Sequence, residues 1–420
     1  MTTLKERTRH LLRWSERYTK TDMLYLATSG FWMNANFLVT AALSLLLSVA
    51  FANFLSKAEY GLYQYVLAIG ALMTAFTLTG MNSTITQSVA RGNEGVLRRS
   101  IRIQLLWNLV PASAALALAG YYLFRGNMVL GCGVLFVSLS LPLLNAYNSY
   151  MPFLTGRKAF RAYALIGITG SAVYYSVMFT GVLLFPKAAP LLFLNLLVTT
   201  AIAFASYIYT LRRFKPNYQN DSKAFAYARH LTFMNVLSTA ATNMDKLLVF
   251  HFLGPIQLAA YALAVLLPER LSGFFKPFLL AAFPRLTERG FSEIRATIFS
   301  RSLQIFAVTF LAAVLYAAIS PAILTLLYPD YSEIIAYSQV YAFTFISVIG
   351  HYGTVALMAH KRVRELYILQ AGIPTVHILM QIGGIYFWGL WGLIIAKVAS
   401  AAMLSISALV LVVAARNPKA

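Results

Sequence analysis

Long runs of apolar residues recur along the whole chain and restrict its fold more than any other feature. A helix of about 20 apolar residues crosses a bilayer core about 30 Å thick. We count twelve such runs, approximately at residues 32–54, 60–89, 101–124, 128–150, 162–185, 190–211, 231–252, 257–283, 298–320, 332–357, 366–387 and 391–414. Only 11% of the residues are charged, against roughly 25% in a soluble domain. The sequence therefore predicts an all-α integral membrane protein of about twelve transmembrane helices.

The positively charged residues alternate with these runs. Most of the 34 lysines and arginines fall in every second connection, whereas the intervening loops hold only Lys57, Arg125 and Lys187. Cytoplasmic loops of membrane proteins carry an excess of lysine and arginine, so we expect both termini in the cytoplasm. The same pattern explains the net charge of +21 without a nucleic-acid partner.

The remaining segments divide the chain into parts. We expect residues 1–23 to form a basic cytoplasmic segment, either an amphipathic helix on the membrane surface or a frayed tail, with no cleavable signal sequence. Residues 24–211 form the first predicted lobe of six helices, residues 212–230 a cytoplasmic linker, and residues 231–420 a second lobe of six helices with a short tail. Cys132 is the only cysteine, which excludes a disulfide and a cysteine-ligated metal.

The two predicted lobes repeat one another. Four residues of the first lobe recur 198 positions later in the second. They are Phe54, Leu55, Tyr63 and Arg91, which recur as Phe252, Leu253, Tyr261 and Arg289 respectively. They fall at corresponding places in the predicted topology. Six helices per lobe insert both lobes in the same direction, so we expect parallel repeats related by an axis along the membrane normal.

Four segments carry a family resemblance: residues 54–63 (FLSKAEYGLY), residues 245–248 (DKLL), residues 252–255 (FLGP), and Pro284 after the eighth span. With them the chain resembles, over nearly its whole length, the polysaccharide transporter branch of the MOP superfamily, which includes the Wzx-type O-antigen flippases. The resemblance implies two lobes facing each other in a MATE-like V around an alternating central cavity. It implies transport rather than catalysis, no cofactor, and an undecaprenyl-pyrophosphate-linked oligosaccharide as the substrate, in a bacterial inner membrane.

Ionisable residues inside the predicted spans are candidate functional residues, because a charge within the bilayer is costly and usually faces a cavity or a partner. There are six, all in the second lobe: Asp245, Lys246, Glu269, Arg270, Lys276 and Lys397. The four cations suit an anionic headgroup, and Arg270 is the principal candidate because its planar guanidinium matches phosphate oxygens. The two carboxylates are candidates for binding a coupling proton or sodium ion. The alternative is that these charges pair structurally and never contact the substrate.

Uncharged residues inside the spans add further candidates. The candidate sugar contacts are Asn34, Asn36, Asn82 and Gln87. They could equally hold helices together. The candidate hinges are Pro268, Pro277 and Gly70, the last at the position equivalent to Pro268 in the second span. Membrane helices also carry prolines without hinging, so an ordinary structural role is the alternative here.

Other functions fit the sequence less well. A membrane glycosyltransferase or polymerase using the same lipid carrier needs acid or base groups near the sugars, and the predicted outer loops offer only Glu59, Asp330 and Glu333. A Gly-rich phosphate-binding loop for ATP is missing, and the six histidines are too dispersed to predict a metal site. A MATE-type multidrug exporter with the same fold is the nearer alternative. The expected partners are the lipid-linked glycan, membrane lipids and glycan polymerase or ligase proteins, with the protein itself a monomer.

Overall fold

The computed structural model describes residues 23–219, 221, 224–288, 290–360 and 362–415, with only the backbone for residues 23–29, 275–288 and 363. Every regular element in this part of the chain is helical. The elements are α2 (Met23–Phe54), α3 (Lys57–Thr74), α4 (Gly80–Ala90), α5 (Val96–Trp107), α6 (Leu109–Phe124), α7 (Met128–Tyr147), α8 (Tyr150–Gly156), α9 (Phe160–Leu184), α10 (Ala188–Phe214), α11 (Ala224–Glu288), α12 (Phe291–Leu327), η1 (Pro329–Tyr331), α13 (Ile334–Tyr341), η2 (Ala342–Ile346), α14 (Ser347–Ala359), α15 (Val363–Tyr367), η3 (Ile368–Gly372) and α16 (Ile373–Ala414). The predicted basic segment at the amino terminus lies outside the described residues, apart from Met23.

Nine helical segments of the described chain are long and apolar enough to cross a membrane. Two of these segments contain two passes each, because α11 turns at Gly254 (φ 83°) and α16 turns at Gly389 (φ 59°). Glycine adopts this left-handed conformation without the steric cost that a Cβ atom imposes. Helices α3 and α4 form one more pass, which is interrupted at residues 75–79. The described residues thus accommodate the twelve predicted passes, and the predicted all-α membrane fold is confirmed.

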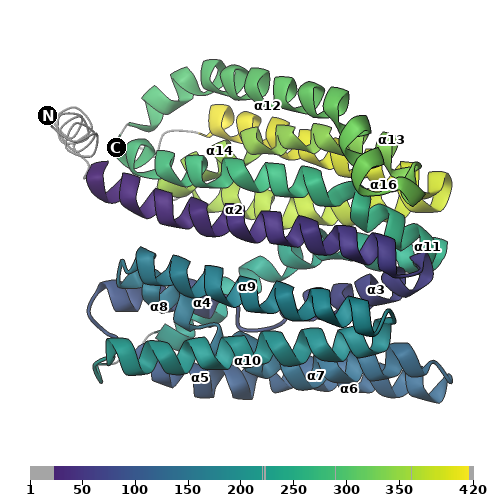
Figure 1. Ribbon diagram of the computed structural model, residues 1–420. Helices are drawn as coiled ribbons and strands as arrows, with labels where there is room; N and C mark the ends of the chain where they lie inside the picture. The colour runs from purple at the N-terminus through teal and green to yellow at the C-terminus, as the bar shows by residue number, and fades with distance from the viewer. Residues whose placement is uncertain (1–22, 220, 222–223, 289, 361, 416–420) are drawn as a thin grey trace, which may run out of the picture.

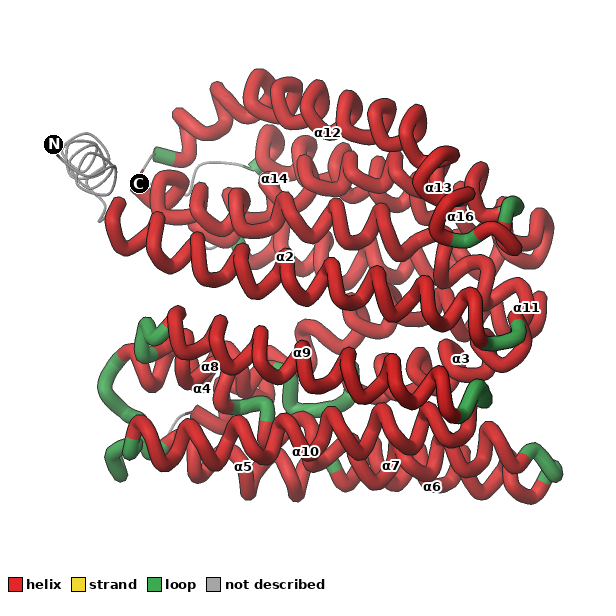
Figure 2. The backbone as a smooth tube through the Cα atoms, viewed as in Figure 1, coloured by secondary structure: helices red, strands yellow, loops and turns green. Residues whose placement is uncertain are grey.

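The helices form two layers (Figure 1). One layer contains α4 to α10, and the other contains α12 to α16. Helix α2 packs mainly against α9, and α11 packs against both α3 and α16, so these two helices connect the layers. Helix α2 begins and α16 ends at the same end of the molecule, on the left of Figures 1 and 2, as an even number of passes requires.

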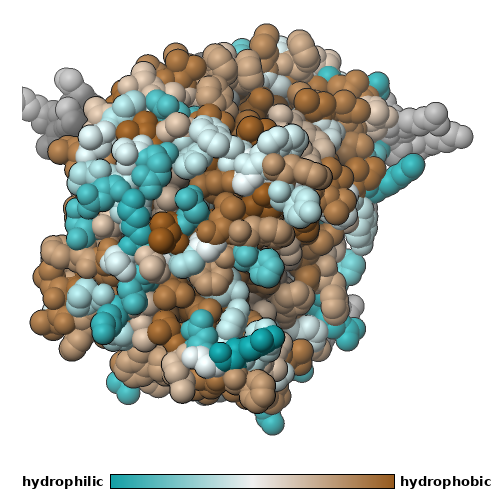
Figure 3. All heavy atoms as spheres, turned by 90° about the vertical axis from the view of Figure 1, so that its right-hand side faces the viewer, coloured by the Kyte–Doolittle hydropathy of each residue, from teal (hydrophilic) through white to brown (hydrophobic). Residues whose placement is uncertain are grey.

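The two layers meet at the right-hand end of Figure 1, where α3 crosses the turn of α11. The largest buried cluster lies here and takes Tyr63 from the first lobe and Leu263 and Tyr328 from the second. A side chain at Gly61 of α3 would collide with the backbone of Pro255, so the two helices approach closely through a glycine. Figure 3 looks onto this end and shows hydrophilic side chains scattered among hydrophobic ones. We call this end the sealed end; by the predicted orientation it is the outer one.

The connection between the lobes is fixed to the first lobe. It is shorter than the predicted linker, since α10 extends to Phe214 and α11 begins at Ala224. The Asn217 amide donates to Glu94 Oε2 at 3.2 Å, and Arg157 Nε lies 3.1 Å from Glu94 Oε1. The connection is thus packed as part of the first lobe.

Candidate functional site

Polar contacts between the lobes close the sealed end. Lys57 Nζ lies 3.2 Å from Glu333 Oε1 and 4.5 Å from the centre of the Tyr331 ring. Burial, with Glu333 as the nearest carboxylate, raises the pKa of Tyr331 to about 12, so the ring stays neutral under the lysine. The hydroxyls of Ser48 and Tyr328 are 2.7 Å apart. These contacts join α2 and the start of α3 to residues 328–333.

The segment of residues 54–63, which carries much of the family resemblance, builds this closure. Ser56 Oγ accepts a hydrogen bond from the Glu59 amide at 3.3 Å and so caps α3. Glu59 Oε2 accepts the Ala188 amide at 2.6 Å, which places a carboxylate at the start of α10, where the helix dipole favours it. Tyr63, the last residue of the segment and the seventh of α3, is buried. The motif is therefore explained by a structural role at the junction of the lobes.

A buried ion pair lies inside the second lobe. Lys397 Nζ of α16 is 2.6 Å from Asp245 Oδ2 of α11, with side chains 8% and 4% exposed. The Tyr261 hydroxyl donates to the same oxygen at 2.7 Å. A buried pair is tolerated only when good geometry and further hydrogen bonds offset the loss of water. The predicted headgroup contact Lys397 is thus engaged by the predicted coupling residue Asp245, as the alternative of structural pairing expected.

Two neighbouring side chains on α16 have unused hydrogen-bonding atoms. His377 interacts electrostatically with both Lys397 and Asp245. Its Nε2 atom is buried and has no hydrogen-bond partner in the described chain. Gln381, one turn farther on, donates to Ala241 O at 3.2 Å, while its Oε1 has no partner among the described residues. Unsatisfied buried atoms of this kind usually mark a water or a bound ligand. Neither residue was among the candidates predicted from the sequence.

The other predicted coupling residue, Glu269, also has a partner in its own lobe. The Tyr341 hydroxyl of α13 donates to Glu269 Oε1 at 3.1 Å. Glu269 is itself exposed, whereas Tyr341 is buried in the core of the second lobe. This hydrogen bond orients Glu269 toward α13.

Arg270 faces the first lobe instead. Its guanidinium lies close enough to Tyr175 of α9 to act electrostatically on that hydroxyl. Gly273 lies on the same face of α11, and a side chain there would meet the Phe37 ring of α2 at 3.0 Å. Arg270 is half-buried and has no ion pair within the described residues. It is thus a cation at the seam between the lobes.

Of the remaining two predicted cations, the structure describes the side chain of Lys246 but not that of Lys276. Lys246 lies one turn from Phe250, whose ring stacks on Tyr65 of α3 with centroids 3.6 Å apart, so it occupies the side of α11 nearer the first lobe. Adjacent helical residues point about 100° apart, so Lys246 does not share the buried direction of Asp245. The side chain of Lys276 lies outside the described residues.

Polar side chains line the contact between α2 and α9. Asn36 approaches Gly167, where a Cβ atom would lie 2.5 Å from its Oδ1. One turn farther, the hydroxyls of Thr40 and Ser171 are 3.1 Å apart, and another turn on, Tyr175 lies against Ser44. The four-residue spacing on both helices is a sequence signal that pointed to this ladder, although we selected only Asn36 from it.

The other candidate sugar contacts lie elsewhere. Asn34 Nδ2 donates to Gly30 O at 2.9 Å, and its buried Oδ1 has no partner in the described chain. Asn82 and Gln87 are exposed on α4. Asn36 lies on the α2–α9 contact, and Arg270 lies near Tyr175, two turns along the same contact. The four candidate sugar contacts are therefore not brought together in one place.

The candidate hinges lie in continuous helix. The only non-helical backbone within α11 is at Gly254, so the helix passes through residues 268 and 277 without interruption. Helix α3 likewise passes through Gly70, and the second span is interrupted five residues later, at residues 75–79. Hinging at these three positions stays a prediction.

Comparison with known proteins identifies the family. A family model described as "Polysaccharide biosynthesis protein" matches residues 26–289. The chain belongs to the polysaccharide biosynthesis protein family. This confirms the predicted membership of the polysaccharide transporter branch of the MOP superfamily. A comparison with curated protein sequences gave no match.

Solved MOP superfamily transporters share the fold of this family member. An inward-facing multidrug resistance MATE family transporter is 14% identical with a TM-score of 0.64, over 89% of this chain and 94% of that chain. An outward-facing one is 12% identical with a TM-score of 0.64, over 91% and 94%. A MOP superfamily transporter from Pyrococcus furiosus, described as having a binding pocket of reversed polarity that suggests a different function, is 13% identical with a TM-score of 0.61, over 91% and 96%. Equal scores for inward- and outward-facing structures mean that the likeness shows the fold and not the conformational state. The protein is a multi-pass membrane transporter.

Proposed function

We propose that this transporter moves an undecaprenyl-pyrophosphate-linked oligosaccharide from the cytoplasmic to the outer face of a bacterial inner membrane by alternating access. The observation that carries the proposal is Arg270, a half-buried cation at the seam between the lobes without an ion pair in the described chain. A pyrophosphate cannot cross hydrocarbon unaided, and a guanidinium offers it a planar, bidentate contact. Lys246 and Lys276 assist in attracting the headgroup, and Lys397 does so only when it leaves Asp245.

Alternating access requires the sealed end to open. In the positive-inside orientation this end faces outward, so the substrate enters from the cytoplasmic side. The Lys57 and Glu333 side chains are 34% and 42% exposed, and an ion pair this exposed contributes only about 0–1 kcal/mol. This ion pair therefore adds little to the resistance of the sealed end to opening.

Uncharged residues and the ionic cluster have separate roles in this proposal. Asn36 and the hydroxyls that follow it on α2 and α9 offer hydrogen bonds to sugars, and Asn34, Asn82 and Gln87 are further candidates nearer the cytoplasmic end. The coupling of transport to a proton or sodium ion, where it occurs, acts at Asp245 or Glu269. The unsatisfied atoms of His377 and Gln381 support the first of these.

Substitution of Arg270 tests the proposal. The variants Arg270→Ala and Arg270→Lys are reconstituted in proteoliposomes, and flipping of a labelled lipid-linked sugar is measured. Arg125→Ala, an exposed arginine over Tyr121 in an outer loop, is the matched control. Loss of a charge-assisted hydrogen bond costs about 1.5–3 kcal/mol, so Arg270→Ala should transport about 10- to 100-fold more slowly, with partial recovery in Arg270→Lys. A folded Arg270→Ala protein that transports normally contradicts the headgroup assignment.

A MATE-type multidrug exporter is the second candidate, because the similar solved structures include multidrug transporters. The two functions differ in the charge of the substrate. A cationic dye should be repelled by Arg270, so dye efflux by the wild type, faster in Arg270→Ala, would favour the exporter. Glycan lengthening without flipping would instead favour the glycosyltransferase or polymerase alternative.

A further inference from the structure

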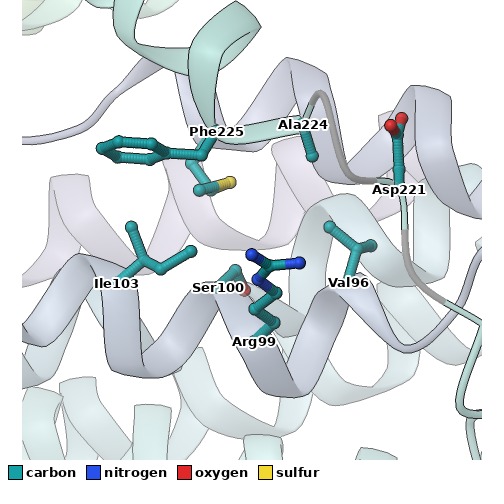
Figure 4. Close-up of a pocket in the computed structure, with 8 residues that line it drawn as sticks. Val96, Arg99, Ser100, Ile103, Asp221, Ala224 and Phe225 are labelled. Atoms are coloured by element: carbon teal, nitrogen blue, oxygen red, sulfur yellow. The ribbon is translucent and has the colours of Figure 1, made fainter.

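A pocket lies at the predicted cytoplasmic end of the first lobe, between the first turns of α5 and α11 (Figure 4). Its volume is about 10 Å³, roughly the space for one water molecule, and it is partly open to solvent. The residues that line it include Met81, Val96, Arg99, Ile103, Asp221 and Phe225. The lobe-joining connection runs directly into the pocket through Asp221 and Phe225.

The rim of the pocket is positively charged. Arg99 and Arg102 are exposed and lie three residues apart on α5, so they share one face of the helix. Arg98 is turned away from them, over the Tyr218 ring at 4.5 Å. Asp221 is the only carboxylate that lines the pocket in the described chain, and its Oδ2 accepts a hydrogen bond from Ser88 at 3.0 Å. The exposed Arg99 and Arg102 make this face of α5 attractive to an anion.

Below the rim the surface becomes aromatic and apolar. Trp107 packs edge-on against Phe225 and Phe233, with ring centroids 6.2 and 6.3 Å apart. Phe233 is 65% exposed and Leu106 is 62% exposed. Phe233 follows Phe225 by eight residues, or about 12 Å of helix. The positive rim thus continues into an apolar surface at the depth of the hydrocarbon.

We propose that the arginine rim of this pocket binds the headgroup of an anionic phospholipid of the cytoplasmic leaflet, with an acyl chain lying along Trp107 and Phe233. Basic pockets between membrane helices bind anionic lipid headgroups. A free phosphate would use the arginines but leave the apolar surface below them uncovered, so the combination fits a lipid. Because α5 and the start of α11 both form the pocket, the bound lipid holds the first turn of the seventh span against the first lobe. The proposal is independent of the transported substrate.

Quenching of Trp107 fluorescence by brominated lipid chains tests whether an anionic phospholipid binds here. A variant with Trp107 as its only tryptophan is placed in nanodiscs that contain brominated phosphatidylglycerol or brominated phosphatidylcholine at equal mole fraction. Each arginine near the membrane surface adds about a fivefold preference for an anionic lipid, so half-maximal quenching should need about 10- to 30-fold less phosphatidylglycerol. Arg99→Gln/Arg102→Gln should abolish this preference. Arg295→Gln/Arg301→Gln, which removes two exposed arginines from α12, is the matched control and should keep it.

Three outcomes overturn the proposal: equal quenching by the two lipids, a preference that survives in Arg99→Gln/Arg102→Gln, and a preference removed by millimolar inorganic phosphate, which would identify a phosphate site. Native mass spectrometry of the unmodified chain makes the same comparison if the single-tryptophan variant fails to fold. There the wild type should retain phosphatidylglycerol adducts that the double-glutamine variant loses.

Discussion

Replacing Lys397 by methionine should strongly destabilise the protein. The change removes the ammonium that lies 2.6 Å from Asp245 Oδ2, in a pair whose side chains are 8% and 4% exposed. Methionine keeps most of the side-chain length, so the loss is mainly electrostatic. Removing one partner of a buried pair leaves an uncompensated charge and costs about 3–5 kcal/mol. The Tyr261 hydroxyl still donates to the carboxylate but cannot replace a full positive charge.

The measurement is the free energy of unfolding in mixed micelles titrated with sodium dodecyl sulfate. Asp245→Asn/Lys397→Met should lie within about 1 kcal/mol of the wild type, because no buried charge remains and asparagine still accepts from Tyr261. Lys57→Met is the control and should cost less than about 1 kcal/mol, since its pair is exposed. A cost below 1 kcal/mol for Lys397→Met, or a double variant as unstable as the single one, refutes the argument.

The same double variant also separates the two roles of Lys397. A stable Asp245→Asn/Lys397→Met protein that flips the labelled lipid-linked sugar normally means that Lys397 is structural. A stable double variant that no longer flips the lipid-linked sugar supports a functional role, either for Lys397 as a headgroup contact or for Asp245 as a coupling residue.

Three shorter predictions concern the seal, the coupling and the topology. Gly61→Val should collide with the Pro255 backbone and hold the sealed end open, so a membrane-impermeant maleimide should react faster with a cysteine placed in the buried seal; unchanged labelling would contradict the close approach. Glu269→Gln keeps the hydrogen bond from Tyr341 and should change stability by less than about 1 kcal/mol, while it flattens the pH dependence of transport if Glu269 carries a coupling proton. A cysteine at Lys187 should react with an impermeant reagent added outside intact cells, and labelling only after lysis would reverse the predicted orientation.

The fold could be predicted because its signals are local. Apolar runs and the alternation of lysine and arginine are readable along the chain without knowledge of contacts. The interruption of the second span at residues 75–79 could not be predicted, because no proline or glycine lies within it. Contacts from distant elements stabilise it: Trp107 Nε1 donates to Phe76 O at 3.1 Å, and Asn108 Oδ1 accepts the Leu78 amide at 3.3 Å. These contacts explain why the break lies here rather than at Gly70.

In the candidate site, too, local geometry could be predicted from the sequence and contacts between distant helices could not. That Asp245 and Lys246 point about 100° apart, and so cannot both face one small site, followed from helical geometry alone. The pairing of Asp245 with Lys397 did not, since the two residues lie on different helices far apart in the chain. Nor did the sequence indicate that Arg270 would face Tyr175, because that contact depends on how the lobes pack.

Two tyrosines that the predicted internal repeat relates belong to chemically different networks. Tyr63 and Tyr261 are buried and related by the repeat. Tyr63 accepts a hydrogen bond from the Asn195 side chain, whereas Tyr261 donates to Asp245 within an ion pair. A neutral amide is enough to satisfy the first tyrosine, and an ion pair in the bilayer is costly, so stability alone gives no reason for charges in the second lobe. A change of protonation or ion binding does give one. Asp245→Asn, combined with Lys397→Met to preserve stability, should therefore alter the dependence of transport on pH or sodium, whereas Asn195→Leu should lower stability without altering it. Equal ion dependence in the wild type and the double variant would show that the ion pair is structural only.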